Sequence, residues 1–205
     1  LEAALISNQL GLPQGGTELP QFRQRCKLDA FDASSSLHAQ LILCLLRSLG
    51  RSTGEVVRMV EIGVHRGETA EWLLGKLPGL RYLGIDPYNG IYDGEEVARS
   101  SGKPGDPDIF LLARQRIHRF GRRATLCRQP SSYVGKRSVR LACRTPWAIN
   151  QWDLLFIDGS HDFESVKTDI LFWSRHVRSG GVLCGHDYRL TDAGVVLAVH
   201  TALPS

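Results

Sequence analysis

Short apolar segments alternate with longer amphipathic segments along most of the chain. The short segments are rich in aliphatic and β-branched residues and are expected to be strands over 56–62, 81–85, 124–128, 153–157 and 182–184. The longer segments carry apolar residues at helical spacing and are expected to be helices over 37–49, 68–77, 108–120, 162–177 and 193–203. Strands that alternate with helices form parallel sheets covered on both faces. The pattern therefore predicts an α/β fold, a Rossmann-like three-layer αβα sandwich with a mainly parallel sheet.

The segments outside this alternation set the limits of the domain. Residues 1–33 contain Gly and Pro and show little periodicity, so we expect a loosely ordered lead-in followed by one domain over 34–205. The segment 88–107 is rich in Gly, Asp, Ser and Pro, and its length suggests a lid over a bound ligand. The segment 131–151 supports no assignment.

Composition narrows the class of protein. No apolar run approaches the roughly 18 residues that a membrane-spanning helix needs, so no membrane partner is expected. Five arginines between positions 114 and 123 are interpreted as a solvated helix face, and no nucleic-acid partner is expected. The five cysteines are odd in number and widely spaced, without a C-x-x-C pair. We therefore expect buried or free thiols in a reducing, cytoplasmic location.

A glycine turn follows the first predicted strand. Gly63 and Gly67 come directly after Glu61-Ile62, and glycines there allow a ligand to approach the backbone at the start of the next helix. The spacing is not the Gly-x-Gly-x-x-Gly of dinucleotide-binding proteins, which argues against an NAD-dependent oxidoreductase. Asp86 ends the second predicted strand, nineteen residues after Gly67. Its carboxylate can accept hydrogen bonds from ribose hydroxyls, and the alternative is that it caps the following turn.

Two carboxylates and two histidines follow the fourth and fifth predicted strands. Asp158 and His161 come after the strand 153–157, and His186 and Asp187 come after the strand 182–184. Neighbouring parallel strands end at the same edge of a sheet, so Asp158, His186 and Asp187 can converge into a site for a divalent cation. The alternative is that the two carboxylates cap turns and bind water. Asp162 is assigned to capping the next helix, and Asp169 within that helix is expected to face solvent.

The glycine turn and its downstream Asp resemble motifs I and II of class I S-adenosylmethionine-dependent methyltransferases. Glu61, Gly63 and Gly67 match the first motif, with His65 where a middle glycine is common. The resemblance implies S-adenosylmethionine as cofactor, and it places Ser131 where such enzymes usually contact adenine. The cofactor-binding residues predicted in this way are Glu61, Gly63, Gly67, Asp86, Ser131 and Asp158.

The Ile-Asp-Gly-Ser-His segment is similar to that of small-molecule O-methyltransferases, which include macrolide-sugar methyltransferases and cephalosporin-hydroxylase-like proteins. This resemblance implies that Asp158 and Asp187 bind Mg²⁺. His186 stands where an acidic residue is usual, and as a third ligand it favours Mn²⁺ or Fe²⁺. His161 stands where the sugar-methylating relatives carry a general base, so His161 and Asp158 are the predicted catalytic residues.

The resulting hypothesis is metal-assisted methylation of a hydroxyl on a small molecule. Class I methyltransferases usually add two more strands after the last helix predicted here, so we expect a truncated sheet with an exposed edge and a tendency to form homo-oligomers. Methylation of a nucleic-acid base is disfavoured, because the usual Asn/Asp-Pro-Pro-aromatic segment is absent. Two alternatives stay open: a module that binds S-adenosylmethionine without turnover, and, with less support, an NAD-type oxidoreductase.

Overall fold

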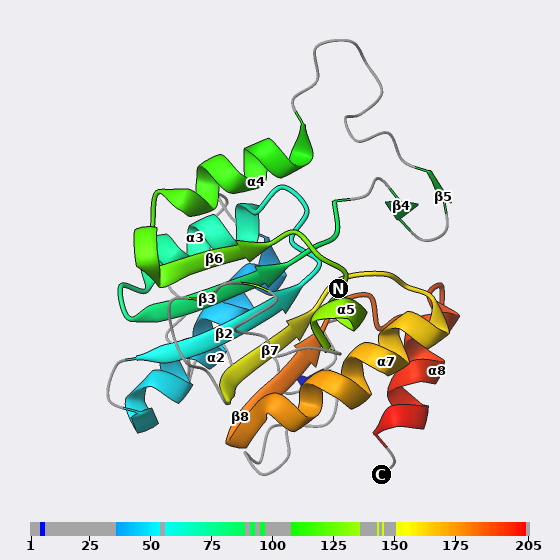
Figure 1. Ribbon diagram of the computed structural model, residues 1–205. Helices are drawn as coiled ribbons and strands as arrows, with labels where there is room; N and C mark the ends of the chain where they lie inside the picture. Colours follow the sequence, from blue (N-terminus) through cyan, green and yellow to red (C-terminus); the bar gives the residue numbers. More distant parts are fainter. Residues whose placement is uncertain are drawn as a thin grey trace.

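A single twisted sheet forms the centre of the protein (Figure 1). The computed structural model describes residues 5–6, 36–53, 56–88, 91–92, 95–96, 108–135, 143, 145 and 151–203. Within these residues the strand order of the main sheet is β1-β8-β7-β2-β3-β6. Five of these strands are parallel: β2 (Val57–Ile62), β3 (Leu80–Ile85), β6 (Ala124–Cys127), β7 (Trp152–Ile157) and β8 (Val177–Gly185). All five predicted strands are confirmed.

Helices cover both faces of the sheet, which confirms the three-layer prediction (Figure 1). On one face lie α2 (Leu37–Thr53), α3 (Glu68–Lys76) and α4 (Ile109–His118); on the other lie α5 (Ser131–Gly135), α7 (Phe163–Trp173) and α8 (Ala193–Ala202). Successive residues of a strand point to opposite faces, so Leu154 and Phe156 enter the first core while Leu155 and Ile157 enter the second. None of the described helices is long and apolar enough to cross a membrane.

The sheet edge beside β8 is partly covered. A short strand, β1 (Leu5–Ile6), pairs antiparallel with β8, with Leu5 opposite Cys184 and Ile6 opposite Leu183. The expectation of an unpaired edge is wrong at these two positions. The rest of the predicted lead-in lies outside the described residues. So does most of the predicted lid, from which the structure describes Tyr88 and the small antiparallel pair β4 (Ile91–Tyr92) and β5 (Glu95–Glu96).

The boundary between α7 and β8 differs from the prediction. The helix ends at Trp173, a 3-10 turn (Ser174–His176) follows, and β8 begins at Val177 rather than at residue 182. An ion pair joins the early part of β8 to β7, because Arg178 Nε lies 2.5 Å from Oδ1 of the buried Asp153 at the start of β7. Gly180 and Gly181 lie inside β8, at an irregularity between the pairs Trp152–Val177 and Leu154–Val182.

Two of the cysteines form a disulfide, which corrects the expectation of free thiols. Cys127, the last residue of β6, is bonded to Cys143, and their Cα atoms are 5.0 Å apart, within the usual range for a disulfide. The pairing joins positions 16 residues apart, and an odd cysteine count gives no sign of it. Cys44 and Cys184 are buried thiols, and Cys26 lies outside the described residues.

The basic stretch between residues 114 and 123 holds α4 against α3. Arg116 Nε lies 3.1 Å from Glu71 Oε2, and Arg119 lies 2.8 Å from the other oxygen of the same carboxylate. Arg123 donates to three backbone carbonyl groups at the end of α3. Three of the arginines are thus engaged in contacts within the protein.

Candidate functional site

A polar cleft of about 760 Å³ opens where β2, β3, β6 and β7 end. Ligands of open parallel sheets bind at this edge, outside the carboxyl ends of the strands. Five of the residues predicted from the sequence line the cleft: Gly63, Asp86, Ser131, Asp158 and His161. The structure therefore places most of the predicted cofactor-binding residues and both predicted catalytic residues around one cavity.

The glycine turn has the backbone conformation that its sequence suggests. Gly63 and Gly67 have positive φ angles of 86° and 74°, and His65 between them also has a positive φ of 50°. Left-handed backbone is costly for a side chain with a Cβ atom, so His65 is held there by its surroundings. Its backbone N–H donates to Asp86 Oδ2 at 2.9 Å.

Asp86 joins the ends of β2 and β3. Its Oδ2 accepts hydrogen bonds from the backbone N–H groups of Val64 and His65, and its Oδ1 accepts one from Tyr88 at 2.8 Å. It therefore caps the turn, which was the alternative reading of this residue. Each carboxylate oxygen has two lone pairs, so Asp86 can cap the turn and still accept a hydrogen bond from a ligand in the cleft.

Glu61 and Gly67 do not line the cleft. Glu61 is buried within β2, where it accepts a hydrogen bond from the hydroxyl of Tyr82. Burial raises the pKa of Glu61 to about 8, against the lowering effect of that hydrogen bond. A Cβ on Gly67 would lie 3.3 Å from the Cα of Ala113, so this glycine allows α3 to pack closely on α4. Both residues thus make contacts within the protein next to the glycine turn. Their contact with a cofactor stays a prediction.

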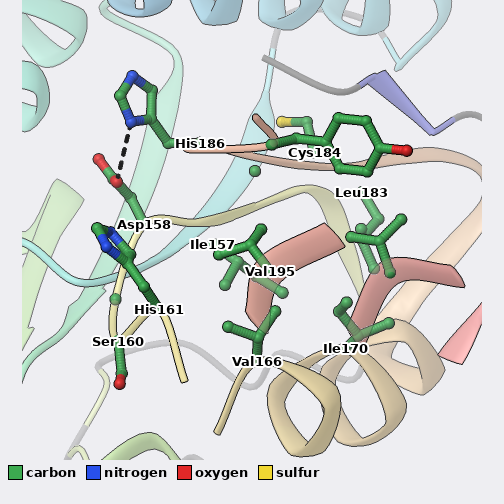
Figure 2. Close-up of a pocket in the computed structure, with 14 residues that line it drawn as sticks. Ile157, Asp158, Ser160, His161, Val166, Ile170, Leu183, Cys184, His186 and Val195 are labelled. Carbon is green, nitrogen blue, oxygen red and sulfur yellow. Dashed lines mark ion pairs between the residues drawn. The ribbon is translucent and has the colours of Figure 1, made fainter. Parts of the chain in front are cut away.

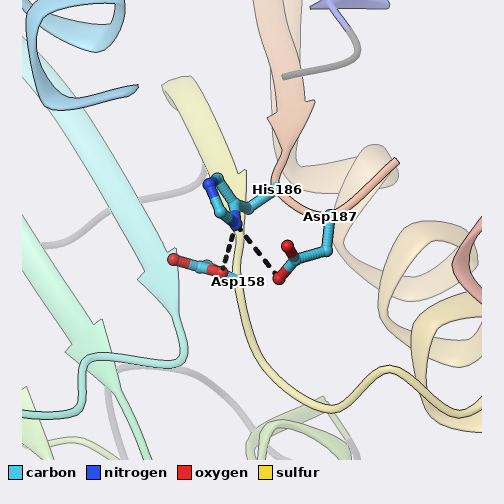
Figure 3. A group of neighbouring side chains, drawn as sticks. All are labelled: Asp158, His186 and Asp187. Atoms are coloured by element: carbon cyan, nitrogen blue, oxygen red, sulfur yellow. Dashed lines mark ion pairs between the residues drawn. The ribbon is translucent and has the colours of Figure 1, made fainter. Parts of the chain in front are cut away.

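Asp158, which lines the cleft, belongs to a compact group of ligand-type side chains that also contains His186 and Asp187 (Figure 3). Nδ1 of His186 lies 3.0 Å from Oδ2 of Asp187 and 3.6 Å from Oδ1 of Asp158. One ligand atom from each of the three residues lies within 4.8 Å of the others. Burial raises the pKa of Asp158, and the attraction of His186 opposes that rise. Asp158 follows β7 and the other two follow β8, so the pairing of these strands brings the group together.

His161 extends this group towards α8. Its Nε2 lies 2.9 Å from Asp187 Oδ2, and its Nδ1 lies 3.4 Å from Asp192 Oδ1. Arg189 contacts both of these carboxylates, at 3.0 Å from Asp187 Oδ1 and through its Nε to Asp192. Asp192 directly precedes α8, but its side chain makes no capping hydrogen bond. No sequence pattern connected Arg189 or Asp192 with His161.

His38 on α2 also meets the cluster and was not singled out from the sequence. Its ring lies edge-on to His186, with centroids 4.9 Å apart, and its Nε2 lies 3.1 Å from Thr69 Oγ1. Burial, together with the repulsion of His186, lowers the pKa of His38 to about 4. The side chain is therefore neutral near pH 7.

Apolar side chains pack next to the group formed by Asp158, His161 and His186 (Figure 2). A small cavity of about 30 Å³ lies between β8, α7 and α8, and Val166, Ile170, Leu183 and Val195 are among its lining residues. Asp158 and His161 line both this largely apolar cavity and the cleft, and His186 lines the cavity. Low polarity behind ionisable groups strengthens the electrostatic interactions among them.

Asp169 is buried, which corrects the expectation that it faces solvent. Its relative exposure is 6%, and it lines the cleft next to Ser131, whose hydroxyl donates to it. Burial raises the pKa of Asp169 to about 6 against the lowering effect of that hydrogen bond. Residue 169 follows Val166 by three positions and precedes Trp173 by four, so helical spacing places it on the buried face. The predicted cap of the same helix, Asp162, is confirmed by its 2.9 Å hydrogen bond from Ser165 N.

The architecture of the sheet and the position of the cleft are those of the class I methyltransferase fold. A family model described as a methyltransferase domain matches residues 60–188, which is more than half of the chain. The chain therefore belongs to this family of S-adenosylmethionine-dependent methyltransferases.

Two further comparisons show other proteins to which the chain is similar. A highly reducing polyketide synthase of Eupenicillium brefeldianum is 32% identical over 111 residues, which is 54% of this chain. The match spans only 4% of the length of that protein. The O-methyltransferase TomG from Streptomyces achromogenes, solved in complex with S-adenosylmethionine, matches with a TM-score of 0.52 and 16% identity. The match covers 88% of this chain and 74% of TomG, and at this identity it supports the fold alone.

Proposed function

We propose that this chain transfers a methyl group from S-adenosylmethionine to a hydroxyl oxygen of a small molecule, with help from a divalent cation. The observation that carries the proposal is that Asp158 and His161 line the same cleft as Gly63 and Asp86, while His186 and Asp187 lie directly beside Asp158 and His161. A cofactor bound along the cleft would thus lie beside groups that can bind a cation and accept a proton.

The cofactor half of the proposal rests on the glycine turn and Asp86. Backbone near Gly63 can approach a ligand closely, and Oδ1 of Asp86 can accept one further hydrogen bond, from a ribose hydroxyl. The carboxylate of Asp158 lines the same cleft and offers negative charge to the positively charged sulfonium. The cleft of about 760 Å³ is within the size range of small-molecule and cofactor sites.

The chemical step requires a proton acceptor. The acceptor oxygen attacks the methyl carbon, the carbon–sulfur bond breaks with its electron pair going to sulfur, and the hydroxyl proton must leave. Both ring nitrogens of His161 face carboxylates: Nε2 lies 2.9 Å from Asp187 Oδ2 and Nδ1 lies 3.4 Å from Asp192 Oδ1. A proton taken up by this imidazole would therefore be held between two carboxylates.

The mixed ligand set fits a divalent cation. Asp158, His186 and Asp187 present two carboxylates and one imidazole within 4.8 Å, a combination that suits Mn²⁺ or Fe²⁺ better than Mg²⁺. When bound, such a cation lowers the pKa of an attached hydroxyl and orients it. The role of the chain itself is to hold these three side chains together beside the cleft and to hold His161 next to them.

Calorimetric titration with S-adenosylhomocysteine tests the cofactor half. We expect wild-type protein to bind both with Mn²⁺ and with EDTA, because no proposed cofactor contact needs the cation. Asp86→Asn should weaken binding by about tenfold or more, since an amide nitrogen replaces one acceptor oxygen. Asp108→Asn is the matched control, because Asp108 caps α4 and does not line the cleft.

Turnover tests the catalytic half. We expect S-adenosylhomocysteine to form when the protein, S-adenosylmethionine and Mn²⁺ are incubated with a panel of phenols, catechols and sugars, with the product's added methyl located on oxygen by mass spectrometry. EDTA should suppress the reaction without preventing cofactor binding. Folded protein that binds S-adenosylhomocysteine but never converts the cofactor would instead support the binding-module alternative.

A further inference from the structure

One buried carboxylate of the cleft has no part in the proposed methyl transfer. Asp169 belongs to α7, is only 6% exposed and lines the cleft together with Ser131 on α5. These two helices lie side by side on the same face of the sheet (Figure 1). Burying a carboxylate is costly unless donors satisfy it, and two oxygens can accept about four hydrogen bonds. The hydroxyl of Ser131 supplies one of them.

The position of Asp169 relates it to one part of a bound cofactor. The methyl group must lie near His161 and Asp158, where the acceptor is deprotonated, and Asp86 stands beside the ends of β2 and β3. Ser131 lines the same cleft and follows β6, the outermost strand on the side of β3. The cofactor is an extended molecule in which sulfur, ribose and base follow one another. With its sulfur near Asp158 and its ribose at Asp86, its base would lie near Ser131 and the carboxylate bonded to that residue, Asp169.

We propose that Asp169, held by Ser131, recognises the exocyclic amine of the cofactor's purine and so determines specificity for adenine. This inference rests on the proposed function, because it takes S-adenosylmethionine as the ligand of the cleft. An exocyclic amine presents two N–H donors, and among the described residues the hydrogen bond from Ser131 uses one of about four acceptor positions of the buried carboxylate. A site built to accept from an N–H group discriminates against an analogue that presents an oxygen there.

The alternative is that Asp169 only joins α7 to α5 through Ser131. Such a structural role predicts a loss of stability on substitution but no change in the choice between ligands. Base selectivity is therefore the informative measurement. The probes are S-adenosylhomocysteine and S-inosylhomocysteine, in which a carbonyl oxygen replaces the exocyclic amine at C6 of the purine.

The experiment measures both dissociation constants by calorimetry for the full chain and for two variants. Wild type should prefer the adenosyl ligand by about tenfold or more, because the inosyl oxygen faces a carboxylate. Asp169→Asn should narrow or reverse this preference, because the new amide can donate to the inosyl oxygen. Glu164→Gln is the matched control: Glu164 lies on the same helix and lines the same cleft, but its side chain is 75% exposed, so the wild-type preference should persist.

The outcomes separate the inference from the function on which it rests. Wild type that binds both ligands equally, or an unchanged preference in Asp169→Asn, would overturn the role of Asp169 and leave the methyltransferase proposal intact. No binding of S-adenosylhomocysteine by folded wild type would overturn the proposed function. If Asp169→Asn does not fold, Asp169→Ser provides a second test: it removes the carboxylate, and a reduced preference in that variant supports the inference, whereas an unchanged preference overturns it.

Discussion

A Cβ atom on Gly63 would lie 1.9 Å from the backbone carbonyl oxygen of Asp158. The backbone of the glycine turn after β2 therefore packs directly against the backbone of the loop after β7. A 2.7 Å hydrogen bond from Asp158 N to Ile62 O joins the two segments. Glycine at position 63 is required to place the carboxylate of the acidic cluster, in addition to any room that it leaves for a cofactor. The cofactor half and the catalytic half of the candidate site are thus in direct contact at Gly63.

Substituting Gly63 with alanine should disrupt both halves. The new methyl group would collide with the Asp158 carbonyl, and residue 63 has a φ of 86°, which alanine adopts at a cost. We expect a loss of about 3 kcal/mol in the free energy of unfolding, measured by denaturant titration, from overpacking and backbone strain together. The folded fraction should also bind S-adenosylhomocysteine poorly.

Gly75→Ala is the control for this prediction. Gly75 lies inside α3, and a Cβ there would have no neighbour within 4 Å. Because alanine is the better helix former, this variant should be up to about 1 kcal/mol more stable than wild type. Equal stability of Gly63→Ala and wild type would contradict the packing argument.

The buried pair of Glu61 and Tyr82 makes stability depend on pH. Burial raises the pKa of Glu61 from 4.5 to about 8, so between these values the folded protein retains a proton that the unfolded chain releases. This contribution is fully present below pH 4.5 and is lost as the pH rises through about 8. We expect Glu61→Gln, which cannot ionise, to remove a decline of a few kcal/mol across that interval, measured by denaturant titration at several pH values.

Other groups also titrate between about pH 4 and 8. The quantity to compare is therefore the difference in the free energy of unfolding between variant and wild type at each pH. The raised pKa of Asp169 acts with the same sign as Glu61. The pKa of His38, lowered to about 4, acts with the opposite sign, because its contribution is present above pH 6.5 and is lost as the pH falls through 4. Glu71→Gln, at a partly exposed position, should leave the wild-type profile in place. A profile for Glu61→Gln parallel to wild type would contradict the assignment.

Local periodicity was sufficient to predict the sheet and its layers. Each parallel strand is a compact apolar segment between turns, and its burial follows from that pattern. β1 escaped prediction because two residues carry no periodicity, and their pairing with β8 joins distant parts of the chain. The Cys127–Cys143 bond escaped for a related reason: only the folded chain brings these positions together.

The site was predictable where its residues follow strands directly. Asp158, His186 and Asp187 stand at the ends of neighbouring strands, and the topology alone makes them converge. His38 and Asp192 reach the same cluster from helix starts, whose positions depend on packing. Asp169 was misassigned although its spacing from Val166 and Trp173 places it on the buried face, because its polar character was given more weight than its helical position.

Replacing His161 with glutamine should impair chemistry more than binding. The side chain is the proposed proton acceptor, and general bases contribute about 10²–10⁴-fold to rate, so kcat for methyl transfer should fall within that range. Affinity for S-adenosylhomocysteine should stay near the wild-type value, because the proposed cofactor contacts remain. His118→Gln, at an exposed position at the end of α4, should leave kcat unchanged. Undiminished turnover in His161→Gln would assign the proton to another group.

Replacing His186 with aspartate should change which cation the cluster prefers. Wild type offers two carboxylates and an imidazole, which favours Mn²⁺, whereas His186→Asp offers oxygen ligands alone, which favours Mg²⁺. We expect calorimetry to show tighter Mn²⁺ binding in wild type and an Mn²⁺-to-Mg²⁺ affinity ratio reduced by about tenfold or more in the variant. The edge-on contact between His186 and His38 is lost in this variant, so His186→Asn, of similar size to aspartate but neutral, serves as the control and should bind either cation weakly. If all three proteins bind Mn²⁺ alike, the ions do not bind at this cluster, and the role of Asp158 and Asp187 is confined to holding His186 and His161 by charge.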